Sequence, residues 1–171
     1  MAHPHLKISI STTLLLLLAF LAGCGYVVGF KSEETKTLGL PGFSNHTFKP
    51  GLEVLARDLL QEKLTKMKVP LVRDPQGADR VLKGTVTSYS KDAAAFDAEQ
   101  VSRQYRLTIS VDFVLTDKGS ERTSWEETVS GTSYYYTGPD VATTEISEYE
   151  ASVRALEEVS QFLANRLLEG F

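Results

Sequence analysis

Apolar and polar residues alternate most regularly in the segment QYRLTISVDFVLTD, residues 104–117. One side of this pattern carries Tyr105, Leu107, Ile109, Val111, Phe113 and Leu115, and the other carries Arg106, Thr108, Ser110 and Asp112. A period of two over this length predicts a β-strand with one face against a core and a polar opposite face.

Two neighbouring segments share this period. On one face of RVLKGTVTSYS, residues 80–90, lie Leu82, Gly84 and Val86. The residues between these two strands, 91–103, predict a hairpin loop or extended strand tips. A turn at 117–119 leads into a further strand that ends at Gly138 and Pro139.

Apolar residues recur at helical spacing after Pro50. The stripe consists of Leu52, Leu55, Ala56, Leu59, Leu60, Leu64 and Met67. Pro50 and Glu53 suit a helix start, lysines suit the carboxyl end, and Pro70 ends the pattern. An amphipathic helix is therefore predicted between the two prolines.

A second helix is predicted over residues 143–170, closing at Gly170. Its apolar stripe consists of Ile146, Tyr149, Val153, Leu156, Leu163 and Leu167. We expect this stripe to face the sheet.

The segment 36–43 alternates weakly and contains Pro41, which limits it to an edge or short strand. The predicted order is thus strand, helix, three strands and helix. It indicates an α+β fold, a two-layer sandwich in which two helices pack on one face of a four-stranded, mostly antiparallel sheet.

The first 23 residues have the layout of a secretory signal peptide: a short stretch with Lys7, an apolar run of roughly 14 residues, and small residues before Cys24. That run is shorter than the ~20 residues of a membrane-spanning helix. The sequence LAGC resembles a bacterial lipobox, in which Cys24 is lipidated and becomes the first residue. A buried core cysteine and a free thiol are the alternatives.

These features divide the chain into a signal peptide (1–23), a lipidated tether (24–35) and one α+β domain (36–171). Acyl chains on Cys24 would anchor the protein in a membrane. Gly25, rather than aspartate, follows the cysteine, which by resemblance to enterobacterial sorting favours the outer membrane. Cys24 is the single cysteine, so no intramolecular disulfide is expected.

Composition and charge narrow the possible functions. The chain contains 42% hydrophobic residues and has a net charge of -4, which excludes bulk disorder and a nucleic-acid binder of high positive charge. His46 is the one histidine outside the signal segment, and no HExxH, CxxC or calcium-loop pattern is present. We therefore expect no enzyme activity, no metal site and no cofactor.

Four segments together resemble the LptE family of lipopolysaccharide-assembly lipoproteins. They are LAGCGY at the anchor, FSNHTFKPGLE before the first helix, ADRVLKGTVTSYS in one strand and QYRLTISVDFVLTD in the next. The resemblance implies a two-layer α+β fold and an outer-membrane lipoprotein. It also implies a one-to-one complex inside the lumen of the LptD β-barrel, as plug and assembly partner, and binding of lipopolysaccharide during its delivery to the outer leaflet.

A plug within a barrel needs a polar exterior, because barrel lumens are lined with polar side chains. The predicted strands supply hydroxyls on one face: Thr85, Thr87, Thr108, Ser110, Thr128, Ser130 and Thr132. As partner-facing residues we nominate Thr87, Ser110, Thr132 and Tyr136. The alternative for the hydroxyl residues is that they simply face solvent, which would give the same pattern. The alternative for Tyr134–Tyr136 is a strand end whose alternate tyrosines pack beneath the second helix.

Lipopolysaccharide carries phosphates, which basic side chains near the strand tips could bind. Lys91, Arg103 and Arg106 are the candidates. The alternative function is a free-standing periplasmic ligand-binding or scaffold lipoprotein that has no barrel partner.

Overall fold

The computed structural model describes residues 36–96, 102–119 and 123–169. The signal segment 1–23, Cys24 and the tether 24–35 lie outside the described residues, so the inferences about them stay predictions. The described residues belong to one compact unit, Thr35–Phe171. The division into signal peptide, tether and domain stays a prediction.

Three long strands form most of the sheet: β4 (Arg80–Phe96), β5 (Ser102–Asp117) and β6 (Thr123–Tyr136). They pair antiparallel in sequence order. The predicted facing of β5 is confirmed, since Leu107, Ile109, Val111 and Phe113 are buried. Strands β4 and β5 extend into the segment 91–103, so the alternative of extended strand tips is the correct one.

Three two-residue strands enlarge this sheet: β1 (Leu38–Gly39), β2 (Ser44–Asn45) and β3 (Leu71–Val72). All three pair parallel, in the order β3-β1-β4-β5-β6 with β2 beside β4. The sheet is therefore six-stranded and mixed, and the predicted four-stranded, mostly antiparallel sheet is wrong. The short strand predicted within residues 36–43 is β1, which lies between β3 and β4 and not at an edge. Strands of two residues are too short to show alternation, and this is why the sequence pattern missed β2 and β3.

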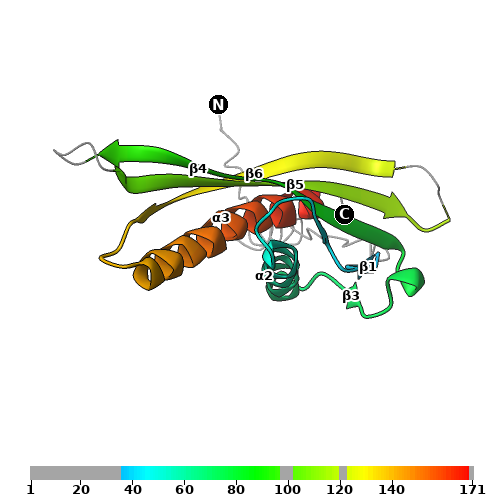
Figure 1. Ribbon diagram of the computed structural model, residues 1–171. Coiled ribbons are helices and arrows are strands. Elements are labelled where there is room, and N and C mark those ends of the chain that lie inside the picture. The colour runs from blue at the N-terminus through cyan, green and yellow to red at the C-terminus, as the bar shows by residue number, and fades with distance from the viewer. Residues whose placement is uncertain (1–35, 97–101, 120–122, 170–171) are drawn as a thin grey trace, which may run out of the picture. The chain divides into compact units, whose positions relative to one another are not determined.

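Two helices, α2 (Leu52–Lys66) and α3 (Val141–Glu169), cover one face of the sheet, and Figure 1 shows both on the same side. Helix α2 buries Leu52, Ala56, Leu60 and Leu64, as its stripe predicted. It begins two residues after Pro50, because Gly51 adopts a left-handed conformation (φ 86°) that only glycine adopts readily.

Helix α3 is rotated relative to the predicted stripe. Leu156, Leu163 and Leu167 are buried, but Ile146 is 61% exposed and Tyr149 is 58% exposed, so their predicted facing is wrong. Small residues, Ala151, Ser152 and Ala155, face inward instead.

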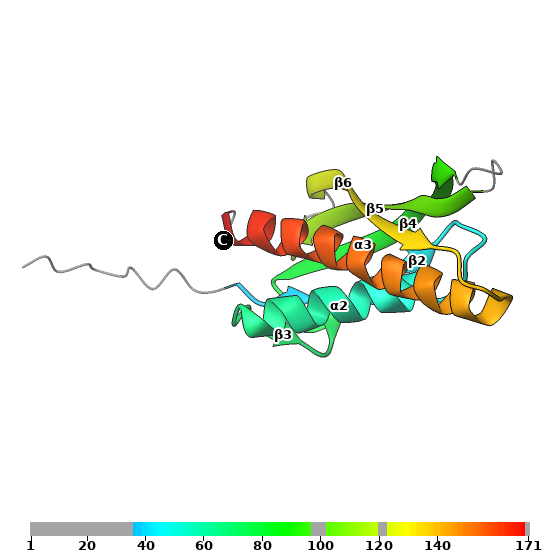
Figure 2. The ribbon, with the colours of Figure 1, turned by 90° about the vertical axis from the view of Figure 1, so that its left-hand side faces the viewer.

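The reason for this rotation is the close approach of α3 to β6, which Figure 2 shows lying next to each other. A Cβ atom at Gly131 would lie 1.9 Å from the carbonyl oxygen of Ala155. Glycine on the strand and alanine on the helix allow this contact, whereas large side chains facing inward would separate the two elements.

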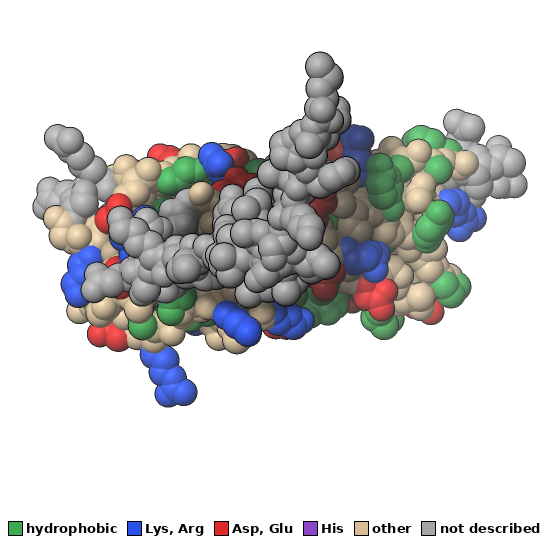
Figure 3. Space-filling model, turned by 180° about the vertical axis from the view of Figure 1, so that it is seen from behind, with side chains coloured by type: hydrophobic (Ala, Val, Ile, Leu, Met, Phe, Trp, Pro, Cys, Tyr) green, Lys and Arg blue, Asp and Glu red, His purple; other side chains and the backbone are tan. Residues whose placement is uncertain are grey.

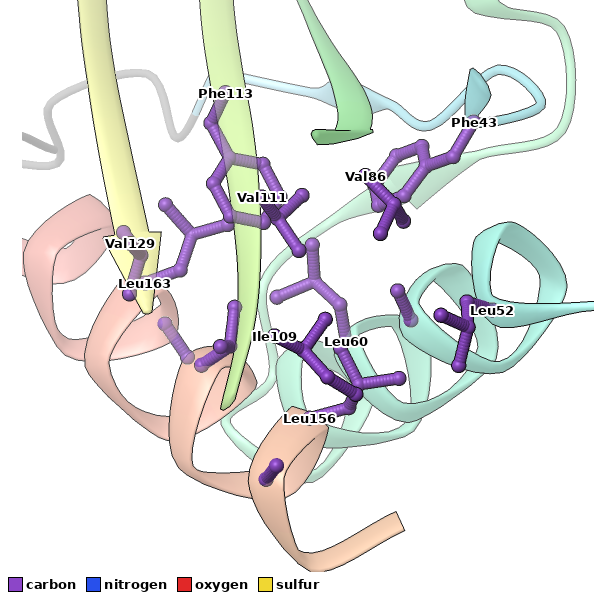
Figure 4. Packing of buried hydrophobic residues seen from close by; sticks show 14 of the residues in the cluster. Phe43, Leu52, Leu60, Val86, Ile109, Val111, Phe113, Val129, Leu156 and Leu163 are labelled. Atoms are coloured by element: carbon purple, nitrogen blue, oxygen red, sulfur yellow. The ribbon is translucent and has the colours of Figure 1, made fainter. Parts of the chain in front are cut away.

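The core lies between the sheet and the two helices (Figure 4). The Phe43 ring packs over Gly84, where a Cβ atom would come within 2.7 Å of it, and meets Phe113 edge-on with ring centroids 6.0 Å apart. Trp125 is partly buried against the core, as expected for core or edge packing. Among residues 36–96, 102–119 and 123–169, no helix covers the opposite face of the sheet, which we call the uncovered face.

Candidate functional site

The uncovered face of the sheet carries a ladder of hydroxyl groups. Ser110 Oγ lies 2.9 Å from Ser130 Oγ, and Thr108 Oγ1 lies 3.3 Å from Thr132 Oγ1. Thr128 Oγ1 donates to Asp112 Oδ1 at 2.7 Å. These cross-strand bonds order short side chains, so the face presents a fixed polar surface.

Three of the four nominated partner-facing residues lie close together on this face. Thr87 occupies an irregularity between Val86 and Ser88, and its Oγ1 donates to the carbonyl of Ser110 at 3.4 Å. Thr132 lies two residues beyond Ser130, which faces Ser110 across the strands. The structure thus brings Thr87, Ser110 and Thr132 together.

Tyr136, the fourth, is 65% exposed and lies further along β6, beside the half-exposed Tyr134. Tyr135 between them is buried and stacks on Tyr105, with ring centroids 5.5 Å apart. The alternative that a tyrosine packs beneath the second helix is therefore confirmed for Tyr135. Tyr134 and Tyr136 remain available on the outer face.

The three basic candidates do not form one cluster. Lys91 is opposite Leu107, on the helix side of the sheet. Arg106 is opposite Asp92 and lies 3.7 Å from its carboxylate, with both side chains more than half exposed. Arg103 is exposed near the start of β5, where its carbonyl accepts the Thr137 N–H. Since side chains alternate between the faces of a strand, Lys91 and Arg106 point away from each other.

Lys91 belongs instead to a cluster around Glu148 on α3, together with Lys49, Tyr89 and Tyr135. Glu148 Oε1 accepts from Lys49 Nζ at 2.7 Å and from the Tyr89 hydroxyl at 2.6 Å. Glu148 Oε2 accepts from Lys91 Nζ at 3.0 Å and from the Tyr135 hydroxyl at 3.5 Å. The two ammonium groups also lie about 6 Å from the Tyr89 ring centroid, within cation–π range.

The cluster joins the segment before α2, the sheet and α3 through one buried carboxylate. Burial alone would raise the pKa of Glu148, but hydrogen bonds from Lys49, Tyr89 and Lys91 outweigh it and lower the pKa from 4.5 to about 2. Burial and the Glu148 charge raise the pKa of Tyr135 to about 12. At neutral pH the carboxylate is therefore ionised, and the Tyr89 and Tyr135 hydroxyls keep their protons and donate hydrogen bonds to it.

Sequence reasoning missed Glu148 because the predicted stripe placed Ile146 and Tyr149 inward. A signal was nevertheless present: Ala151 and Ala155 follow Glu148 after three and seven residues, and these small residues mark the face that meets the sheet.

The surface of the described residues mixes several kinds of side chain. Basic, acidic and apolar side chains are interspersed on the face that Figure 3 shows, outside the part covered in grey. Among residues 36–96, 102–119 and 123–169, no group of three or more potential ligands is placed to hold a metal ion. Within those same ranges, no helix is long and apolar enough to cross a membrane.

Residues 35–169 match the sequence model of the LptE family, which is described as lipopolysaccharide-assembly. The chain belongs to the LptE family. The family is one of envelope lipoproteins that assemble lipopolysaccharide rather than catalyse a reaction. The predicted membership of the LptE family is thereby confirmed, and the match includes three of the four segments, since LAGCGY precedes residue 35.

Several solved structures are similar to this chain, and two with TM-scores above 0.5 share its fold. A minor lipoprotein from Acinetobacter baumannii is 17% identical, with a TM-score of 0.52, and the match covers 78% of this chain and 93% of that one. A protein from Xanthomonas campestris is 12% identical, with a TM-score of 0.55 and coverage of 80% and 89%. Rare lipoprotein B from Shewanella oneidensis is 20% identical, with a TM-score of 0.49 and coverage of 78% and 92%. No curated protein sequence matches the chain significantly.

Proposed function

We propose that this LptE-family lipoprotein plugs the outer-membrane β-barrel LptD in a one-to-one complex and helps to assemble it. The observation that carries the proposal is the hydroxyl ladder of Ser110, Ser130, Thr108 and Thr132 on the uncovered sheet face. Barrel lumens are lined with polar side chains, and short hydroxyls can donate to or accept from either kind of group without burying a charge.

Thr87, Ser110, Thr132 and Tyr136 would contact the lumen wall in this complex. Lys91, Arg103 and Arg106 would bind the phosphates of lipopolysaccharide at the strand tips during its delivery to the outer leaflet. Since Lys91 and Arg106 lie on opposite faces of the sheet, they would serve different phosphates. Lys91 would keep its bond to Glu148 and present the remaining ammonium protons.

Ser110→Asp tests the interface. The side chain lies on the uncovered face, so we expect the free-energy change of the isolated domain to stay within roughly 1 kcal/mol. In the complex the new carboxylate would enter a desolvated contact without a partner, so the amount of barrel that co-purifies in mild detergent should fall severalfold.

Ser110→Ala is the matched control, since it removes the same hydroxyl without adding charge. Normal recovery of a barrel with Ser110→Asp would contradict the assigned interface. If no barrel co-purified even with the unaltered protein, the function would be that of a free-standing envelope lipoprotein.

We also propose that Cys24 is acylated and anchors the mature protein in the outer membrane. Cys24→Ala should leave a precursor that incorporates no labelled palmitate and remains unprocessed, because the variant lacks the thiol that carries the lipid. Equal incorporation of palmitate by Cys24→Ala and the unaltered chain would contradict the anchor.

A further inference from the structure

The outer edge of β6 has backbone groups that could pair with a further strand. In the strand order β3-β1-β4-β5-β6, the strand β6 has a neighbour on one side only. Backbone N–H and C=O groups on an edge strand can pair with an added strand unless side chains cover them. Helix α3 covers one half of this edge and leaves the other half open.

The carboxyl-terminal half of the edge is capped. The Thr132 N–H donates to Glu158 Oε2 at 2.9 Å, and the Tyr134 carbonyl accepts from Arg154 Nη2 at 3.1 Å. Arg154 Nε also donates to Ser133 Oγ at 3.1 Å. Two side chains of α3 thus satisfy the backbone groups that a further strand would need.

In the preceding part of the edge, residues 126–130, the outward backbone groups point the same way, but Glu158 and Arg154 do not bond them. Because outward backbone groups alternate along an antiparallel strand, the groups of Glu126, Thr128 and Ser130 face outward as those of Thr132 do. Within the described part of the chain, no side chain bonds these groups. We call residues 126–130 the open edge.

A groove runs along the helix side of the open edge. Two adjoining hollows, of about 270 and 360 Å³, share Arg166 and Glu169 of α3. Trp125 lines the first, and Glu127 and Phe162 line the second. Phe162 is 48% exposed, so the groove offers apolar contact as well as charge.

Charge determines which side chains fit this groove. Arg80 also lines the first hollow, whereas in the second hollow Glu127 and Glu169 both lie 3.6 Å from Arg166. Glu126 adds an exposed carboxylate on the open edge, so carboxylates outnumber cations beside the second hollow. Glu127 Oε2 is shielded from solvent and accepts no hydrogen bond from the described residues. A lysine or arginine entering the second hollow would offset this excess of carboxylate charge.

We propose that the open edge of β6 binds an extended partner segment in which basic and apolar residues alternate. The segment adds to the sheet through the outward backbone groups of Glu126, Thr128 and Ser130, and its alternate side chains enter the groove beside Glu127 and Phe162. The caps at Thr132 and Tyr134 limit the added strand to the open edge. This inference does not depend on the barrel complex.

The test uses the full mature lipoprotein in detergent and a fluorescein-labelled peptide, acetyl-(Lys-Val)₄-amide. We expect saturable binding in fluorescence anisotropy that weakens with added salt, and none for acetyl-(Glu-Val)₄-amide. Thr128→Pro removes one outward N–H from an edge position that tolerates proline, so affinity should fall about tenfold or more. Thr128→Ala keeps the N–H and should stay within about twofold of the unaltered protein.

Hydrogen exchange on the unaltered protein gives a second readout that does not depend on the folding of a variant. The (Lys-Val)₄ peptide should slow exchange of the Thr128 amide and leave the capped Thr132 amide unchanged. Equal binding of the acidic peptide, unchanged affinity of Thr128→Pro, or unaltered exchange at Thr128 would each overturn the proposal.

Discussion

Gly131→Ala should destabilise the domain by about 3 kcal/mol or more, although it adds a single methyl group. The added Cβ would lie 1.9 Å from the carbonyl oxygen of Ala155, and no side-chain rotation can relieve a clash with backbone. Helix α3 would have to move away from β6 and open the contacts around Val159 and Leu163. Chemical denaturation monitored by circular dichroism measures the loss.

Gly42→Ala is the matched control, because no atom lies within 4 Å of a Cβ at that position. We expect it to change stability by less than about 1 kcal/mol. Ala155→Gly should not rescue Gly131→Ala, since the clash is with the carbonyl oxygen and not with the Ala155 side chain. A rescue, or equal losses for the two glycine variants, would contradict the close approach of α3 to β6.

Glu148→Gln should lower the free energy of unfolding by about 3 kcal/mol at pH 7, which corresponds to the lowering of the Glu148 pKa from 4.5 to about 2. Glutamine resembles the protonated carboxyl, so Lys49 and Lys91 lose their shared counter-charge. Glu150→Gln, on the exposed face of the same helix, is the control and should change stability little.

The cluster around Glu148 also makes the free energy of unfolding depend on pH, with lower stability in acid. Because the pKa of Glu148 is lower in the folded state, its stabilisation is fully present above about pH 4.5 and disappears as pH falls toward 2. The difference in unfolding free energy between the unaltered protein and Glu148→Gln should therefore shrink across this range. A difference that stays constant from pH 7 to pH 2.5 would contradict the stabilising role of the ionised Glu148.

The sequence was sufficient to predict the long strands and α2, because each carries many apolar residues at one clear period. It was insufficient for β2 and β3, since pairs of residues have no period. The parallel pairing of β1, β2 and β3 was also not predictable, because it depends on where the intervening chain returns. The rotation of α3 depends on Gly131, a residue of another element, and therefore could not be read from the helix pattern alone.

The part of the candidate site that lies on the long strands was predictable from their alternation. Alternation on β5 and β6 placed Ser110 and Thr132 on the polar face, where the structure has them. Lys91 and Arg106 were grouped because both lie near the strand tips, but position along a strand does not give the face. Glu148 was missed because a buried acid is recognisable only once its partners from β4, β6 and the segment before α2 are in place.

Photo-crosslinking in living cells tests the barrel-plug proposal most directly. A photoreactive amino acid would replace Ser110, Thr87, Thr132 and Tyr136 in turn, with the exposed Lys66 on α2 as the control position. We expect several of the four sheet-face positions to crosslink to one outer-membrane barrel identified as LptD, and Lys66 to do so weakly or not at all. Crosslinks to soluble periplasmic proteins alone, or none at any sheet-face position while the protein is folded and lipidated, would contradict a role as barrel plug.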